Sequence, residues 1–278
     1  MNSLRYGCTG RWPVHSFQKK GGPAAALMFG AAALLAPEPA AAQSAPAVAA
    51  AAVGRPQAGQ SVADFYRARK GAPLWLTPQA GDAAQQLISL LGSASVDGLS
   101  PDKYHPTALQ QMVQAAREQN KRKEVERADE ALSEAFAAYV DDLRQDPGVG
   151  ITWVDPQLKP IPPSALAALL QASAAPSLSA YVRDMSWMHP FYGELRRALS
   201  DHQYSDDDKR DVIELNLKRA RILPPGKERY VLVNAAQQRL FMYEGGKAVD
   251  SMVVVVGKTK WPTPMLGAYI RFAALNPY

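Results

Sequence analysis

Apolar residues recur at three- and four-residue steps over residues 124–145, and this spacing predicts a long amphipathic helix. One face of the helix carries Val125, Ala128, Leu132, Phe136, Tyr139, Val140 and Leu143. The helix is expected to end at Asp146-Pro147-Gly148, because proline and glycine do not readily continue a helix. It is the best-defined element that the pattern predicts.

Shorter apolar runs on both sides of this helix predict a helical region over residues 61–223. Ser164 can cap one of the helices, and Ser205 with Asp208 has the spacing of a capping box. The acidic run 206–208 suits the positive end of a helix dipole better than a metal site, because three adjacent side chains cannot all face one ion. Between the helices, residues 149–163 are rich in proline and are expected to be irregular. The shorter helices are predicted at residues 64–69, 83–91, from about 107, 164–172, 178–185, 191–203 and 205–222.

After Pro224-Pro225-Gly226 the sequence changes to short runs rich in β-branched and aromatic residues. Gly245-Gly246 predicts a two-residue hairpin turn, and the uninterrupted apolar run 252–256 predicts a strand that needs neighbours on both sides. The strands are predicted at residues 230–234, 239–244, 252–256 and 269–275. An alternating apolar set is expected in a core and not around a ligand. This set is Val231, Val233, Leu240, Met242 and Met252.

The predicted fold class is therefore α+β. An all-α helical domain at residues 61–223 is followed, at residues 228–278, by the first strands of a mostly β domain. Three or four strands with one continuous apolar run cannot close a core alone, so their missing neighbours are expected beyond Tyr278.

Residues 1–42 have the order of a secretory signal peptide. Lys19-Lys20 precede an apolar run at residues 24–36, and the small residues end in Ala40-Ala41-Ala42, an A-x-A cleavage site. The run has about 13 residues, short of the roughly 20 that span a bilayer, which disfavours an uncleaved membrane anchor. Residues 43–60 are rich in Ala, Pro, Gly and Gln and have the composition of a disordered linker. The folded part is therefore expected in the periplasm.

The formal charge of the chain is +5, but most of the excess lies in the predicted signal peptide. A nucleic-acid partner is not expected, since no basic stripe with interleaved aromatic residues occurs. Cys8 is the only cysteine, and it lies in the segment that cleavage would remove. The mature chain is then expected to have no disulfide, no thiolate and no sulfur ligand for a metal.

Groups for acid-base, nucleophilic or metal chemistry are scattered along the sequence. The histidines, His15, His105, His189 and His202, are far apart, so no zinc-type spacing exists. His105 and His189 each precede a proline, a position typical of loop residues, and neither is expected to be catalytic. No Gly-x-Ser-x-Gly elbow and no Gly-rich phosphate loop occurs, and no cofactor is expected.

A succession of short motifs runs from Arg219 to the end of the sequence. It reads Arg-x-Arg-Ile-Leu-Pro, Tyr-Val-Leu-Val-Asn, Arg-Leu-Phe-Met-Tyr-Glu-x-Gly-Lys, Val-Val-Val-Gly-Lys, Pro-Thr-Pro and Asn-Pro-Tyr. The upstream motifs are Phe65-Tyr66-Arg67, Pro73-Leu74-Trp75, Gly98-Leu99-x-Pro101-x-x-Tyr104 and the apolar run 132–143. In their collinear order, the motifs make most of residues 62–278 resemble L,D-transpeptidases of the large periplasmic type. The matching parts are a helical scaffold domain and the entry into the catalytic domain.

The resemblance implies a peptidoglycan L,D-transpeptidase. In this family a cysteine thiolate attacks an L,D-peptide bond of a tetrapeptide stem, expels the terminal D-alanine and passes the acyl group to an amine of a neighbouring stem. The thiol needs a histidine partner and backbone N–H groups that hold the oxyanion. In the family these groups follow the Asn-Pro-aromatic corner. The catalytic Cys and His are therefore expected beyond Tyr278, and the chain is expected to be truncated and inactive alone.

The residues that are present are expected to act mainly as scaffold. The candidate substrate-binding residues are Pro262, Thr263, Pro264, Asn276 and Tyr278. The two prolines of Pro-Thr-Pro are expected to fix an extended turn, and a rigid loop without ligand contact remains the alternative for both motifs. The expected partners are peptidoglycan peptide stems, with a peripheral association with the inner membrane or with cell-wall synthases.

Two other functions remain open from the sequence. A non-catalytic cell-wall binding or scaffold protein would agree with the absence of a cysteine after cleavage. A peptidase of the same fold would cut the same bond with water as the acceptor.

Overall fold

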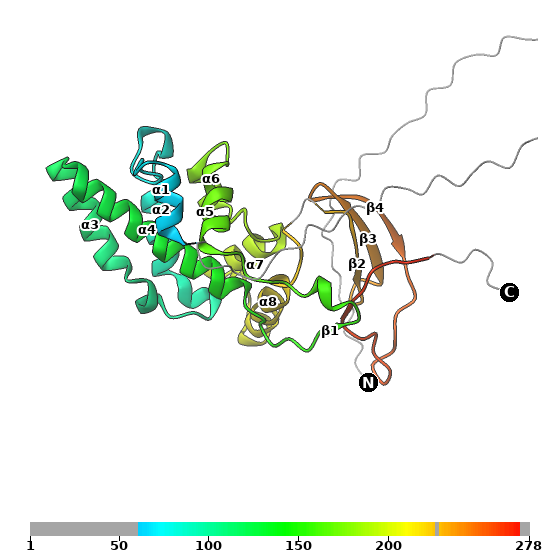
Figure 1. The fold of residues 1–278 in the computed structure, drawn as a ribbon. Coiled ribbons are helices and arrows are strands. Elements are labelled where there is room, and N and C mark those ends of the chain that lie inside the picture. The colour runs from blue at the N-terminus through cyan, green and yellow to red at the C-terminus, as the bar shows by residue number, and fades with distance from the viewer. Residues whose placement is uncertain (1–60, 226–227, 273–278) are drawn as a thin grey trace, which may run out of the picture. The chain divides into compact units, whose positions relative to one another are not determined.

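The computed structural model describes residues 61–225 and 228–272, all of which belong to one structural unit, Val53–Tyr278. The predicted signal peptide and linker lie outside the described residues. Helices precede residue 221, and an antiparallel sheet follows from residue 230 (Figure 1). The fold class is α+β, as predicted. Among the described residues, no helix combines the length and the apolar character needed to cross a bilayer.

The helical region contains eight described α-helices. They are α1 (Val62–Ala68), α2 (Ala83–Gly92), α3 (Pro106–Gln119), α4 (Arg122–Arg144), α5 (Ala165–Ser173), α6 (Leu178–Arg183), α7 (Pro190–Ser200) and α8 (Asp207–Ala220). Helix α1 begins earlier than predicted because Ser61 and Asp64 form a capping box, in which each side chain accepts from the other's backbone N–H. Ser164 caps α5 as predicted, since its hydroxyl oxygen accepts from the N–H of Ala167.

The predicted cap of α8 was wrong by one residue. Asp206, and not Ser205, is the N-cap, because its carboxylate accepts from the N–H of Lys209 at 2.9 Å. The Ser205 hydroxyl instead donates to Asp206. These bonds, that of Ser205 first, lower the pKa of Asp206 to about 2.

Helix α4 is the central element of the helical region. Its predicted apolar face is confirmed by the burial of Leu132, Phe136, Tyr139, Val140 and Leu143, each 1% exposed or less. It packs against α1, α2, α3 and α5 (Figure 1). These side chains pack into one core because their spacing in the sequence follows the helical repeat of 3.6 residues per turn.

Asp129 on α4 is a fully buried carboxylate that collects four donors. The backbone N–H groups of Leu74, Trp75 and Leu76 donate to it at 2.6, 2.8 and 2.8 Å. The hydroxyl of Tyr66 donates at 2.5 Å. One side chain therefore satisfies the backbone of the loop between α1 and α2 and ties it to α4, since buried donors are costly when left unpaired.

Asp97 forms a second buried polar centre, at the end of the 3₁₀ turn η2 (Ala94–Asp97). The hydroxyls of Tyr139 and Tyr192 each donate to its carboxylate at 2.7 Å, and Nε of Arg196 donates at 2.9 Å. Burial, with the nearby charge of Asp97, raises the pKa of both tyrosines well above 10. They remain donors, and the network fixes α7 to the helical core.

Three antiparallel strands follow the helices in the order β2 (Tyr230–Asn234), β3 (Arg239–Glu244) and β4 (Lys247–Val253), side by side in Figure 1. The predicted two-residue hairpin between β3 and β4 is confirmed. Gly245 and Gly246 both have positive φ, 58° and 78°, as a type I′ turn requires.

The strand predicted at residues 252–256 was wrong in its position. The strand spans Lys247–Val253, and its last pair is Arg239 with Val253. The partner strand β3 begins at Arg239, so β4 has no strand to pair with beyond Val253. One more hydrogen bond follows, in which the N–H of Val254 donates to the carbonyl of Gln238 at 3.0 Å. The apolar run 252–256 therefore continues beyond the point where its partner strand ends.

The alternating apolar set lies on one face of the sheet, as the pairs Val231–Met242, Val233–Leu240 and Leu240–Met252 show. We refer to these five residues as the apolar sheet face. The prediction that they form a core is not met within the described residues, because Val231, Val233 and Met252 are 37, 46 and 46% exposed. The described strands and helices leave this face partly uncovered.

A short parallel pair joins β1 (Thr152–Trp153) to β5 (Leu266–Gly267). The N–H of Thr152 donates to the carbonyl of Met265 at 3.0 Å, and that of Val154 donates to Gly267 at 2.9 Å. The prediction of irregular structure at residues 149–163 was therefore wrong at β1. The strand predicted at 269–275 is not formed at residues 269–272, and residues 273–275 lie outside the described part.

Replacing Asp129 by Asn is expected to lower the free energy of unfolding by about 3 kcal/mol, because an amide nitrogen cannot accept from the buried N–H groups of residues 74–76. Urea unfolding measures this loss. The neighbouring exposed Glu130→Gln removes the same charge and should stay within about 0.5 kcal/mol of the parent. Equal effects of the two changes would contradict the role of Asp129.

Candidate functional site

The predicted Pro262-Thr263-Pro264 motif lies in an exposed segment that precedes β5. The hydroxyl oxygen of Thr263 accepts a hydrogen bond from the N–H of Gly257 at 2.8 Å. The motif thus closes a loop that begins where the Val254–Val256 run ends. Asn276 and Tyr278, the other candidate residues, lie outside the described residues. Whether any of the five contacts a substrate stays a prediction.

The loop is built around a tight turn from Lys258 to Trp261. The N–H of Trp261 donates to the carbonyl of Lys258 at 2.8 Å. A Cβ atom at Gly257 would overlap the carbonyl oxygen of Trp261. Glycine is therefore required at residue 257 because the backbone approaches itself there.

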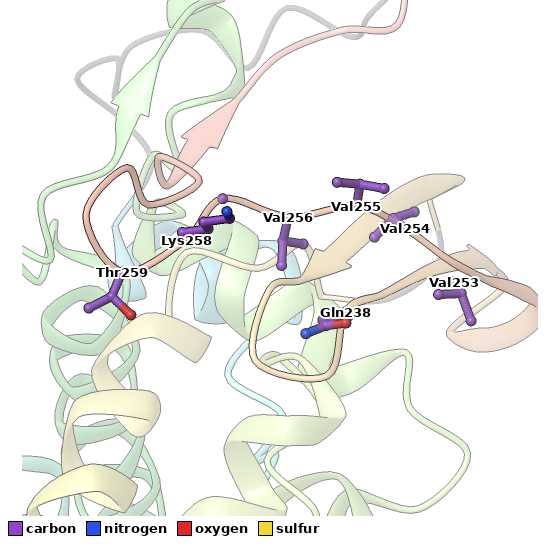
Figure 2. Close-up of a pocket in the computed structure, with 8 residues that line it drawn as sticks. Gln238, Val253, Val254, Val255, Val256, Lys258 and Thr259 are labelled. Carbon is purple, nitrogen blue, oxygen red and sulfur yellow. The ribbon is translucent and has the colours of Figure 1, made fainter.

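A groove of about 570 Å³ borders this loop and is lined by Gln238 and residues 253–259. Figure 2 shows the side chains of Val255 and Val256 on opposite sides of an extended segment. This alternation is typical of a strand, although the segment has no ladder of its own among the described residues. The groove offers apolar side chains and backbone groups, which can hold an extended chain.

The charged chemistry of the groove is limited to one side chain. Among the described residues that line the groove, Lys258 is the only ionisable one, and none is a histidine, a carboxylic acid or a cysteine. Within residues 61–225 and 228–272, no group of three or more His, Cys, Asp and Glu could hold a metal ion. The described residues of the groove can therefore contact a ligand, but they include no thiol and no imidazole.

A buried carboxylate fixes the segment that follows β5. Asp155, 5% exposed, accepts from the N–H of Tyr269 at 2.8 Å and pairs with Arg271. These contacts, that of Tyr269 first, lower the pKa of Asp155. Residues 152–155 thus add both a strand and an ionic contact to the segment that leads toward Asn276.

The side chain of Trp153 lies directly on Gly267, where a Cβ would come within 2.6 Å of the indole ring. A glycine at this position lets the tryptophan close over β5. These contacts could not be predicted from the sequence. The residues involved are more than 100 positions apart, and each strand is too short to have a periodic pattern.

The three described histidines do not come together. His105 and His189 are the N-cap residues of α3 and α7, which agrees with their predicted place at the edge of a loop, and His202 is exposed. His189 is nevertheless buried and contacts Tyr230 on β2. That contact was not predicted.

Comparison with known families gives two matches. A family model described as a scaffold domain matches residues 60–199, and one described as an L,D-transpeptidase catalytic domain matches residues 228–278. No curated protein and no solved structure matches the chain significantly. The two family models fall on the helical region and on the segment that contains β2–β5.

Replacing Asp155 by Asn is expected to speed amide exchange at Tyr269 at neutral pH, because the ion pair with Arg271 is lost. In the parent chain the same release should occur on acidification. The lowered pKa means that the carboxylate holds the contact fully above its usual pKa of 3.8 and loses it as the pH falls through the lower, folded value.

NMR-detected exchange between pH 6 and pH 3, corrected for the intrinsic rate, measures both effects. Asp146→Asn is a matched control, because Asp146 also has a lowered pKa but pairs with Lys159. Unchanged exchange at Tyr269 in Asp155→Asn would contradict the assignment.

Replacing Thr263 by Val keeps the shape of the side chain and removes the acceptor for the Gly257 N–H. Exchange at Gly257 is expected to become about fivefold faster, since one hydrogen bond contributes about 1 kcal/mol. Thr259→Val is the control, because the hydroxyl of Thr259 makes no hydrogen bond within the described residues. Equal exchange rates in the two variants would show that Thr263 does not close the loop.

Proposed function

Because the chain belongs to the L,D-transpeptidases that carry a scaffold domain, we propose that it serves the cross-linking of peptide stems in peptidoglycan. The observation that carries this proposal is the match of the L,D-transpeptidase catalytic domain to residues 228–278. The proposed substrates are peptidoglycan stems, and the proposed site of action is the periplasm, reached through the signal peptide expected at residues 1–42.

The proposed reaction is acyl transfer through a cysteine thioester. A thiolate adds to the carbonyl carbon of the L,D-peptide bond, and the oxyanion collapses as the terminal D-alanine leaves with a proton. An amine of a second stem then attacks the thioester, and the thiolate is released. In the alternative peptidase, water replaces this amine.

The residues of the chain have supporting roles in this proposal. Its only cysteine is Cys8, in the expected signal peptide, so we place the nucleophile and its histidine partner in sequence that follows Tyr278. Residues 43–278 alone then carry no acyl-transfer activity. The helical region holds the first strands of the catalytic domain through the pairing of β1 with β5 and through the contacts of Asp155.

The groove at residues 253–259 supports a role in holding an extended stem. The described residues of the groove present backbone groups and valine side chains, and Lys258 is the one charged side chain among them. We also propose a peripheral association with the inner membrane or with cell-wall synthases.

The test compares purified residues 43–278 with the same chain continued through the codons after Tyr278. Both are incubated with disaccharide tetrapeptides, and products are separated by chromatography and mass spectrometry. We expect cross-linked dimers, with loss of D-alanine, only from the longer chain. Its Cys→Ala variant is the control and should be inactive.

Three other outcomes are distinguishable. Hydrolysed tripeptide without dimers would indicate the peptidase. Retention of residues 43–278 on isolated sacculi, with no activity in the longer chain, would indicate a cell-wall binding protein. Cross-linking by residues 43–278 alone would contradict the placement of the nucleophile.

A further inference from the structure

His189 caps the first turn of α7, and its sequence neighbours explain how. Pro190 is the first residue of the helix and has no N–H, so the first backbone donor that needs a partner is that of Phe191. Nδ1 of His189 accepts this bond at 3.1 Å. An imidazole nitrogen can accept only when it carries no proton, so the cap requires Nδ1 to be unprotonated.

The other ring nitrogen contacts the first strand of the sheet. Nε2 of His189 lies 2.5 Å from the hydroxyl oxygen of Tyr230 on β2. In a neutral imidazole with an accepting Nδ1, the hydrogen is on Nε2, which therefore donates to Tyr230. One tautomer thus satisfies the helix cap and the contact with the sheet at the same time.

Aromatic rings surround this imidazole and keep water away. His189 is 1% exposed, and its ring centroid lies 4.6 Å from that of Phe191 and 6.0 Å from those of Tyr230 and Tyr243. The two tyrosine rings are stacked, with centroids 4.8 Å apart. His189 therefore lies in a small aromatic enclosure between α7, β2 and β3, formed by Phe191, Tyr230 and Tyr243, which we call the box.

Among the described residues, no acidic group forms a contact with the ring that would compensate a charge on it. The titratable groups facing His189 are Tyr230 on β2 and Tyr243 on β3, whose pKa values are raised by burial. Two carboxylates act on these tyrosines, Glu228 on Tyr230 and Glu194 on Tyr243, and neither forms a hydrogen bond with the imidazole. Burial alone lowers the pKa of His189 to about 4.

We propose that His189 is a pH-dependent latch between α7 and β2, closed by the neutral ring and released when a proton from solvent binds Nδ1. The added proton occupies the lone pair that accepts from Phe191, so two N–H groups then face each other. The resulting imidazolium is buried without a counter-charge, and it leaves the box for water. Its departure breaks the bond to Tyr230 as well as the helix cap.

The direction of the pH effect follows from the lowered pKa. A histidine that is harder to protonate when folded stabilises the closed state fully above its usual pKa of 6.5, and this stabilisation declines as the pH falls toward 4. Between pH 7 and pH 5, the opening equilibrium is expected to shift by about 20-fold. The latch depends neither on a peptidoglycan substrate nor on a thiol, so its test is independent of the test of the proposed function.

The experiment measures amide exchange in residues 43–278 at pH 7 and pH 5, corrected for the intrinsic rate. The amides of Phe191 and of the β2–β3 ladder should lose protection by about 20-fold, while those of α2 and α4 keep theirs. In His189→Asn, the side-chain oxygen can still cap α7 but does not titrate, so the pH effect should vanish. His202→Asn removes an exposed histidine and should keep it.

A second readout uses the parent chain, and one further variant accompanies it. In the parent chain, NMR of labelled histidine should show the Nε2–H tautomer of His189 at pH 7 and a titration midpoint near 4. Tyr230→Phe should keep the ring packing and lower β2 protection at pH 7. An Nδ1–H tautomer, a midpoint near 6.5, or a pH effect that persists in His189→Asn would overturn the proposal.

Discussion

The contact between His189 and Tyr230 joins the helical region to the first strand of the sheet. It is firm on the helical side, because α7 also carries Tyr192 and Arg196, which bind the buried carboxylate of Asp97. A three-stranded sheet is marginal by itself, so β2–β4 need a support of this kind. The parallel pair β1–β5 adds a second attachment farther along the chain.

Through these two attachments the helical region supports the sheet. Its own core is complete around α4 and Asp129, and the sheet is fixed to it through a few polar and aromatic contacts. The apolar sheet face is left partly exposed by the described elements. The helical region thus has a complete core, the described strands leave an apolar face partly exposed, and a different family model matches each of these two parts.

Much of the fold could be predicted because it follows from local patterns. The periodic face of α4 and the Gly245-Gly246 hairpin depend on spacing and on positive φ, both of which are legible in the sequence. The strand at residues 252–256 was misplaced because strand ends depend on the partner's length. The cap of α8 moved by one residue because Ser205 and Asp206 are both good caps.

The candidate site was less predictable because it is made by distant residues. Thr263 closes its loop as an extended Pro-Thr-Pro turn can, but Asp155, Trp153 and His189 acquire their roles only through partners far along the chain. A buried histidine before a proline has the same sequence pattern as an exposed one, as His105 illustrates. Tertiary contact, and not residue type, distinguishes them.

The helical region holds the strands of the sheet in place through His189 and through the pairing of β1 with β5. Amide exchange of β2 and β3 measures this support when residues 43–278 are compared with the isolated peptide 228–278. We predict strong protection in the chain and almost none in the peptide. Equal protection in both would contradict the claim, because the strands would then need no support from the helices.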